Sequence, residues 1–413
     1  MTMDLGLSER GREVRDRIRT IIDENIIPVE EEYHAEVERA QDRWTLTPRM
    51  TEILDGLKDQ AKREGLWNFW LTDSERGFGL TTVEYAYIAE ELGRSQLASE
   101  VFNCSAPDTG NMEVLERYGS AEQKEKWLKP LLDGTIRSAY VMTEPGVASS
   151  DATNLSVEAR LDGDEWVING EKWWASGAGD SRCKVFITML RTEGEDAPRH
   201  NRHSMILVER DAPGVEILRP MMVFGHDDAP HGHMHIRFND VRVPKDNLVH
   251  HRGAGFEVAQ GRLGPGRIHH CMRSIGAAER ALGLMCRRAL EREAFGRPLA
   301  KLGANYDIIA ECRIEIEQAR LLCLKAAHMM DTIGAIKAGP YISQIKVVAP
   351  RMSLKVIDEA MQMHGGAGIS QDFPFAPMWH AQRTLRYADG PDAVHRMVIA
   401  RDELKATYRK HNV

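Results

Sequence analysis

The spacing of hydrophobic residues divides the chain into three zones, of which the first is helical. From about residue 8 to residue 134, apolar positions recur three and four residues apart, as on one face of a helix. Ser120 and Gln123 form a capping box, in which each side chain satisfies a backbone N–H of the first turn. We expect the helix that follows to end at Gly134. This zone predicts a helical domain over residues 1–134.

The second zone, about residues 135–249, changes to an alternation of apolar and polar residues, which is typical of strands. Two alternating segments flank Asp162-Gly163-Asp164, and Asp-Gly supplies the positive φ angles that a short hairpin turn needs. The runs Val185–Met189 and Ser204–Val208 predict two further short strands, both strongly apolar. We therefore predict a β-domain over residues 135–249.

Helical spacing returns near Gly255 and continues to the C-terminus. Three long segments, at 268–294, 305–333 and 341–364, carry apolar stripes that are too broad for a lone surface helix. Such stripes predict a helical bundle over residues 250–413. Helices, then strands, then helices imply an α+β fold with a small β-domain between two helical domains.

The composition is that of an ordinary globular protein of 413 residues, with 42% hydrophobic and 28% charged residues. The net charge is −8 and the basic residues are dispersed, so the electrostatic footprint of a nucleic-acid-binding protein is absent. The sequence contains no run of about 18 apolar residues, the length that a membrane-spanning helix needs. The polar start is unlike a signal peptide, and six cysteines without a CxxC pair fit reduced thiols. We expect a soluble cytoplasmic protein.

Two segments of the predicted β-domain carry residues suited to a planar or charged ligand. Thr143-Glu144-Pro145-Gly146, followed by Ser149-Ser150-Asp151, ends a strand in a turn that can present hydroxyls and backbone N–H groups. Trp173 and Trp174 are adjacent, and adjacent strand residues point to opposite sides. One tryptophan can then face the core while the other flanks a planar ligand. If each segment is considered alone, simpler explanations are that the turn is a plain loop and that both tryptophans are packing residues.

Two segments near the C-terminus add a glycine-rich turn and an acid. Gln362–Gly368 has three glycines in four residues, more than a helix C-cap needs, which allows backbone to approach a ligand closely. Asp389 stands before Gly390-Pro391, and Pro391 can begin a final helix over about 391–408. An acid at such a place is commonly only a helix cap.

Together these segments resemble the acyl-CoA dehydrogenase family, whose order and spacing they match over essentially the whole chain. Asn239–Pro244 resembles the strand that closes the family's β-domain, and Arg292–Gly296 resembles its flavin-binding Arg-x-x-Phe-Gly. The resemblance implies an N-terminal helical domain, a middle β-domain and a C-terminal four-helix bundle. It is closest to the branch whose animal members are often fused to a kinase-like domain, and we expect no kinase-like domain in this chain.

The resemblance implies a flavin-dependent reaction on an acyl-CoA thioester. Asp389, by position, takes the α-proton while the β-hydride passes to N5 of FAD, which leaves the trans-2-enoyl-CoA. The backbone N–H of the base residue and a ribityl hydroxyl of FAD donate to the thioester oxygen. Electrons then pass to an electron-transfer flavoprotein. Most family members have glutamate as the base, and aspartate is shorter by one methylene, on the order of 1.5 Å.

The resemblance also assigns contacts residue by residue. Thr143 and Ser176 hydrogen-bond the isoalloxazine, Ser176 near N5, and Trp174 shields the ring face opposite the substrate. The implied cofactor-binding residues are Met142, Thr143, Ser149, Trp174, Ser176, Arg292, Gln362, His364, Gly365 and Gly366. The implied substrate-binding residues are Ser150, Gly264, Arg267 and Gly390. Ser149 and Ser150 can exchange roles because this branch has one extra residue in the turn, and an internal ion pair is an equal alternative for Arg267.

Part of the implied cofactor site belongs to a second subunit. Arg292 would reach the FAD pyrophosphate of a neighbouring subunit, and Gln362, Gly365 and Gly366 would line the same cross-subunit site. An active monomer is then excluded. We expect a homodimer or a homotetramer with FAD near the subunit interface.

Two other classes of function stay open. One is an oxygen-using flavoenzyme on the same fold, such as an acyl-CoA oxidase, a monooxygenase or a nitroalkane oxidase, the last of which also uses an aspartate base. The other is a helical scaffold that has lost its chemistry. The length and branching of the acyl chain depend on pocket depth, and one methylene changes binding by only about 1–3 kcal/mol.

Three histidines invite a further hypothesis. His231, His233 and His235 alternate on one probable strand, so that all three face the same way, and imidazoles are good zinc ligands. The same segment leads into the strand that closes the family's β-domain. We therefore expect a polar lining near substrate or flavin and no metal.

Overall fold

The computed structural model describes residues 3–71 and 77–411, and the chain forms two compact units. The sheet unit contains Val29–Leu71 and Glu100–Leu263. The helical unit contains Met1–Pro28, Thr72–Ser99 and Gly264–Val413. The elements follow one another as helices, then strands, then helices, which confirms the predicted α+β class. No helix in the described ranges has both the length and the apolar character that crossing a membrane requires.

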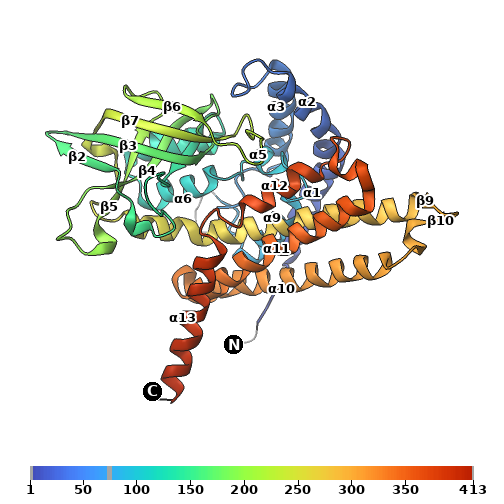
Figure 1. The fold of residues 1–413 in the computed structure, drawn as a ribbon. Coiled ribbons are helices and arrows are strands. Elements are labelled where there is room, and N and C mark those ends of the chain that lie inside the picture. Colours follow the sequence, from blue (N-terminus) through green and yellow to red (C-terminus); the bar gives the residue numbers. More distant parts are fainter. Residues whose placement is uncertain (1–2, 72–76, 412–413) are drawn as a thin grey trace. The chain divides into compact units, whose positions relative to one another are not determined.

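The sheet unit is built on eight hydrogen-bonded strands (Figure 1). They are β1 (Arg137–Val141), β2 (Glu158–Asp162), β3 (Glu165–Ser176), β4 (Cys183–Arg191), β5 (His203–Glu209), β6 (Val215–Pro220), β7 (His233–Pro244) and β8 (Leu248–Val249). Their order is β6-β7-β3-β2-β4-β5-β8, and β1 pairs with β4 in parallel. The predicted Asp-Gly hairpin is confirmed, since β2 and β3 are antiparallel and Gly163 has a φ of 64°. Trp166, Phe186 and Phe238 lie in the core of this sheet.

The sheet unit also contains helices, which precede the first strand in the sequence. They are α2 (Glu30–Arg39), α3 (Pro48–Arg63), α6 (Asp108–Tyr118), α7 (Ala121–Gln123) and α8 (Lys129–Asp133). The capping box of Ser120 and Gln123 is confirmed at the start of α7, where both reciprocal hydrogen bonds are present. A π-helical stretch, Lys124–Leu128, joins α7 to α8. Gly134 ends α8 in the left-handed conformation, as predicted.

The helical unit packs long helices against one another. Its elements are α1 (Glu9–Ile21), α4 (Thr82–Leu92), α9 (Gly255–Glu291), α10 (Asn305–Lys337), α11 (Gly339–His364), α12 (Phe375–Thr384) and α13 (Asp392–His411), with α9 beginning in the sheet unit. The helix predicted at 268–294 therefore starts earlier, and Pro265 lies inside it. A β-carbon on Gly276 would lie 1.8 Å from the carbonyl oxygen of Glu90, so α4 and α9 touch backbone to backbone. In Figure 1, α9, α10 and α11 run alongside one another.

A cluster of charged side chains is enclosed in the sheet unit. Glu100 pairs with Lys58 (2.8 Å), Arg182 (2.6 Å) and Arg137 (3.1 Å), and Arg137 also pairs with Asp108 at 2.6 Å. Burial acts to raise the pKa of Glu100, but Arg137, Lys58 and Arg182 outweigh it and hold that pKa well below 4.5. Sequence patterns did not reveal this cluster because its members come from separate helices and strands.

Glu100→Gln is expected to destabilise the protein by roughly 3 kcal/mol at neutral pH, because cationic partners lose a buried carboxylate. The carboxyl pKa is lower in the folded state, so its stabilisation is present above about pH 4.5 and is lost as the pH falls toward the folded pKa. Urea unfolding between about pH 3 and pH 7 should therefore show a shallower acid dependence in the variant. Glu209→Gln, in an exposed pair with Lys126, is the control. Equal acid slopes in wild type and Glu100→Gln would contradict the assignment.

Candidate active site

The two adjacent tryptophans lie at an irregularity of the sheet. The register of β3 against β7 shifts at this point, and Trp174 has a φ of 54°. Such a bulge re-aims side chains. The ring of Trp173 lies 6.4 Å from that of His235, and the ring of Trp174 lies 5.7 Å from that of His233. Because these histidines are two residues apart on β7, both tryptophans lie on one face of the sheet, which differs from the regular alternation that we expected.

Neither tryptophan lies in the core. Trp173 is half-buried, and Trp174 is 37% exposed in a left-handed backbone conformation that favours glycine or asparagine. An exposed aromatic ring at a strained position needs a reason outside the chain's own packing. A flat apolar surface beside the hydroxyl of Ser176, at the end of β3, suits one face and one edge of a planar heterocycle.

The three histidines of this region have different partners. β7 begins at His233, so His231 precedes the strand and the expectation that all three share one strand face is wrong. Nδ1 of His233 lies 2.7 Å from Oγ of Ser176, and its Nε2 lies 3.2 Å from a carboxylate oxygen of Asp228. His235 contacts a glutamate of β3 at 2.9 Å. Burial lowers the pKa of His231 to about 4.

The loop after β1 is held by a network of its own. The backbone N–H of Glu144 donates to Oγ of Ser149 at 2.9 Å, so this hydroxyl supports the turn, while Ser150 is exposed. The backbone N–H of Trp173 donates to the carbonyl of Thr143 at 2.9 Å, which ties the loop to β3. The side chains of Met142 and Thr143 are half-buried beside it.

A buried ion pair joins this loop to the sheet. Lys172 Nζ lies 2.7 Å from Oε1 of Glu144, and it donates to the carbonyls of Met142 (2.9 Å) and Met189 (2.7 Å). All three ammonium hydrogens therefore have acceptors. Burial lowers the pKa of Lys172 to about 8, against the opposing effect of Glu144. Burial also acts to raise the pKa of Glu144, but Lys172 and backbone donors prevail and lower it.

In the helical unit, Asp389 occupies a turn that its surroundings hold in place. Asp389 has a φ of 56° and Gly390 a φ of 104°, both in the region that side chains disfavour. Nε of Arg267 lies 3.0 Å from the carbonyl oxygen of Asp389, and Nε2 of His395 lies 3.2 Å from the same atom. A strained conformation that is fixed by several contacts is typical of a functional site.

Lys346 fixes the residues just before Asp389. Its Nζ donates to the carbonyls of Leu385 (2.6 Å) and Ala388 (2.8 Å), and its side chain is buried. Burial lowers the pKa of Lys346, with Cys271 and Asp389 opposing. Burial also lowers the pKa of His395 to about 4, which keeps this imidazole neutral at physiological pH.

The carboxylate of Asp389 remains partly open, with 20% of the side chain exposed. Nε2 of His270 lies 3.5 Å from its Oδ2. Arg267 contacts the backbone carbonyl of Asp389 rather than its carboxylate, and burial lowers the pKa of this guanidinium against the pull of Asp389. Gly264 is buried near the same part of α9. The turn thus presents an acid whose backbone carbonyl is held by two side chains.

The segment after α9 forms a tight hairpin with an exposed aromatic tip. Strands β9 (Glu293–Ala294) and β10 (Arg297–Pro298) are joined by Phe295 and Gly296, which both have positive φ. Phe295 is 96% exposed, and Arg292 is exposed beside it. Figure 1 places the hairpin at the far end of α9 and α10.

The glycine-rich segment after α11 divides into packed and open positions. A β-carbon on Gly368 would lie 2.3 Å from the carbonyl oxygen of Met361, and Gly365 has a φ of 64°. Gly366 has neither constraint, and Gln362 is exposed. His364 is buried instead, with its Nδ1 2.7 Å from the carbonyl of residue 360 and its ring in edge contact with the stacked rings of Phe373 and Phe375. Any contact of His364 with a cofactor would come from its backbone.

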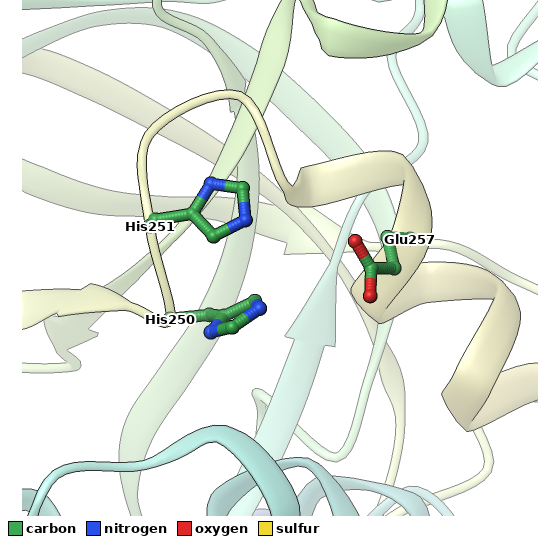
Figure 2. A group of neighbouring side chains, drawn as sticks. All are labelled: His250, His251 and Glu257. Atoms are coloured by element: carbon green, nitrogen blue, oxygen red, sulfur yellow. The ribbon is translucent and has the colours of Figure 1, made fainter.

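A group with potential metal ligands lies elsewhere on the sheet unit. Figure 2 shows His250, His251 and Glu257, whose donor atoms lie within 4.8 Å of one another. Within the ranges that the structure describes, it is the one such group of three. All three side chains are exposed, and we assign them no role in the site.

Three family models match successive parts of the chain. They describe the acyl-CoA dehydrogenase N-terminal domain over residues 8–135, the middle domain over 139–241 and the C-terminal domain over 253–404. The chain is 49% identical over 403 residues to "Probable acyl-CoA dehydrogenase FadE2" of Mycobacterium tuberculosis, covering 97% of each chain. The solved structure "Structure of a putative acyl-CoA dehydrogenase from Mycobacterium abscessus" has a TM-score of 0.93 at 51% identity, covering 97% of this chain and 100% of the other.

The animal relatives are longer. "Acyl-CoA dehydrogenase family member 11" of Gallus gallus is 53% identical over 401 residues, which is 96% of this chain and 51% of that protein. The chain thus spans about half the length of this relative. On this evidence of fold and sequence, the chain belongs to the acyl-CoA dehydrogenase family, whose cofactor is FAD.

The residues present fit such a cofactor. The exposed ring of Trp174 and the hydroxyl of Ser176 lie together at the end of β3, beside the loop that carries Met142 and Thr143. Motifs located these residues, but they missed Lys346, which lies about 40 residues from the turn that it anchors. Partners so distant in sequence leave no local pattern that could have found them.

Proposed function

We propose that this chain catalyses FAD-dependent α,β-dehydrogenation of an acyl-CoA thioester, with Asp389 as the base that removes the α-proton. The observation that carries the proposal is the turn of Asp389, which pairs a left-handed backbone with a partly open carboxylate. Strain of this kind costs of order 1–3 kcal/mol and is retained where it serves a site. The carboxylate accepts the proton, and the neighbouring backbone polarises the thioester.

The anchoring contacts support an oxyanion-stabilising role for the same turn. A trans peptide is planar, with its N–H pointing opposite to its C=O. Lys346 holds the carbonyl of Ala388, so the N–H of Asp389 points away from Lys346. Arg267 and His395 hold the carbonyl of Asp389, so the N–H of Gly390 points away from them. An N–H group that is oriented in this way can donate to an oxyanion.

The sheet unit would hold the cofactor. Trp174 would cover one face of the isoalloxazine, and Thr143 and Ser176 would bond its polar edge, with Met142 and Ser149 shaping the loop. Bound FAD supplies the acceptor for the hydride that leaves the β-carbon. Asp389 supplies the proton acceptor, and the bulge at Trp174 supports the proposal because it exposes a ring that the chain's packing does not need.

Several finer assignments belong to the same proposal. Ser150, Gly264, Arg267 and Gly390 would contact the substrate, and an electron-transfer flavoprotein would receive the electrons. The exposure of Ser150, set against the use of the Ser149 hydroxyl within its turn, supports Ser150 as the residue that faces the ligand. A cytoplasmic location and a division into domains at residues 134 and 249 remain predictions.

The proposal is tested with a panel of acyl-CoA thioesters of graded length and branching, assayed with an artificial electron acceptor. At least one member should bleach the flavin anaerobically and yield the 2-enoyl-CoA. The reduced protein should persist in air. Rapid reoxidation with release of hydrogen peroxide would instead support an oxygen-using flavoenzyme. Purified protein that takes up no FAD would support the alternative of a helical scaffold that has lost its chemistry.

We also propose that the active form is a homodimer or homotetramer, in which the hairpin of Phe295 contacts a second copy of the chain near FAD. The support is its 96% exposed ring, held at a positive φ that phenylalanine disfavours. Arg292, exposed beside it, and the open positions Gln362, Gly365 and Gly366 would complete the cofactor site of that second copy.

Phe295→Asn is expected to weaken the oligomer and release FAD. Asparagine tolerates positive φ, so the turn is kept while the ring is lost. Each buried phenylalanine stabilises by about 1.5–3 kcal/mol, so two in a symmetric dimer correspond to at least roughly a 100-fold loss of affinity. Sedimentation equilibrium and the flavin-to-protein ratio measure both effects. Leu161→Asn, at an exposed apolar position on β2, is the control. An unchanged oligomer in Phe295→Asn would rule out this contact.

A further inference from the structure

Ser176, His233 and Asp228 form a hydrogen-bonded chain that ends at the proposed flavin edge. Ser176 is the last residue of β3, and His233 is the first of β7, paired with it across the sheet. The Ser176–His233 contact of 2.7 Å and the His233–Asp228 contact of 3.2 Å use both nitrogens of one imidazole. The side chains of His233 and Asp228 are only 18% and 23% exposed, so these hydrogen bonds are partly shielded from water.

The chemistry of the partners sets the direction of these hydrogen bonds. An ionised carboxylate only accepts, so Nε2 of His233 donates its proton to Asp228. With the ring proton on Nε2, Nδ1 is an acceptor, and Ser176 donates its single hydroxyl hydrogen to it. Oγ of Ser176 is left with lone pairs and no hydrogen for its next partner.

We infer that Asp228 and His233 are positioning residues that make Ser176 a hydrogen-bond acceptor toward N5 of the flavin. This inference rests on the proposed function, in which Ser176 meets that edge of the ring. N5 carries a hydrogen in the reduced ring and none in the oxidised ring. An acceptor at this place therefore stabilises the reduced state and makes FAD a better electron acceptor.

Without His233, the preference of Ser176 for the reduced ring is lost. The hydroxyl hydrogen of Ser176 would no longer be committed, and it could turn to donate to the unprotonated N5 of the oxidised ring. A free hydroxyl can hydrogen-bond to N5 in either redox state. A hydroxyl whose hydrogen is committed to His233 can only accept, so it hydrogen-bonds only to the reduced ring. The hydrogen bonds of His233 with Asp228 and Ser176 thus determine whether the Ser176 hydroxyl acts as a donor or as an acceptor toward N5.

The test is the midpoint potential of the purified, FAD-loaded proteins, measured by equilibration with a reference dye. His233→Ala should shift the ratio of reduced to oxidised flavin about tenfold toward the oxidised form, which is about 30 mV for a two-electron couple. His233→Asn keeps an acceptor near the Nδ1 position and should recover most of the shift. His251→Ala removes an exposed imidazole of the sheet unit that has no assigned role in the site, and it should leave the potential unchanged.

A double-mutant cycle separates action through Ser176 from a direct effect of His233. In a Ser176→Ala background, His233→Ala should cause no further shift. A shift of the same size in both backgrounds, or none in His233→Ala alone, would overturn the inference. If His233→Ala does not fold, the comparison of His233→Asn with Ser176→Ala still decides it, since equal potentials in these two would also overturn it. Failure of the proposed function is distinct, because wild type would then bind no FAD or reduce with no acyl-CoA.

Discussion

Asp389→Asn is expected to lower the turnover of acyl-CoA by about 100- to 10,000-fold, the range that a positioned general base contributes. Asparagine has the same shape and tolerates the left-handed backbone that Asp389 adopts, so the turn should persist. It cannot accept the α-proton. Steady-state rates with an artificial acceptor and the rate of anaerobic flavin bleaching measure the effect directly.

The accompanying measurements separate loss of the base from loss of the site. FAD content, melting temperature and substrate binding should match wild type in Asp389→Asn, since the anchors on the neighbouring carbonyls remain. Asp389→Glu lengthens the side chain by one methylene and should keep measurable turnover, because the acid is preserved. Near-normal turnover of Asp389→Asn with FAD bound would remove Asp389 as the base.

The geometry around Asp389 bears on why a shorter acid can serve here. Arg267, His395 and Lys346 each bind a backbone carbonyl of the turn, so the position of the chain, rather than the length of the side chain, places the carboxylate. Contacts that over-determine a backbone can hold it where a shorter side chain reaches its target. If a glutamate stood on an exposed loop instead, the position of its carboxylate would depend more on the conformation of the side chain.

Local chemistry explains which parts of the fold the sequence predicted. The capping box at Ser120, the glycine stop at Gly134 and the Asp-Gly hairpin at Gly163 all act within a few residues, and all three are confirmed. The bulge at Trp174 was missed because it depends on the pairing of β3 with β7, about 60 residues further along the chain. His231 was placed on a strand that begins only at His233, since alternation alone does not mark where pairing starts.

The candidate site divides in the same way. Motifs identified the acid, the tryptophan strand and the glycine-rich turn, because a few adjacent residues carry each of them. The residues that orient these groups, such as Lys346, His395 and Asp228, stand alone in the sequence and show their roles only through contacts. Buried polar side chains with several partners are the group that sequence patterns overlook.

Lys172→Met is expected to destabilise the protein by about 3–5 kcal/mol, the cost of removing one partner from a buried pair. Methionine keeps much of the volume, but Glu144 then remains as a buried carboxylate without its cation. The carbonyls of Met142 and Met189 lose their donor as well. Since Met142 and Glu144 belong to the loop that would contact the flavin, the affinity for FAD should fall with stability.

Urea unfolding and FAD titration of the apoprotein measure the two effects of Lys172→Met. Lys184→Met, at an exposed lysine on β4, is the matched control and should change stability by less than about 0.5 kcal/mol. The double variant Glu144→Gln/Lys172→Met replaces the orphaned charge by a neutral amide, whose single oxygen can still accept from one of the two backbone N–H groups that Glu144 binds, those of Ser156 and Val157. It should therefore recover part of the lost stability. If Lys172→Met were as stable as Lys184→Met, the pair could not be what holds the loop against the sheet.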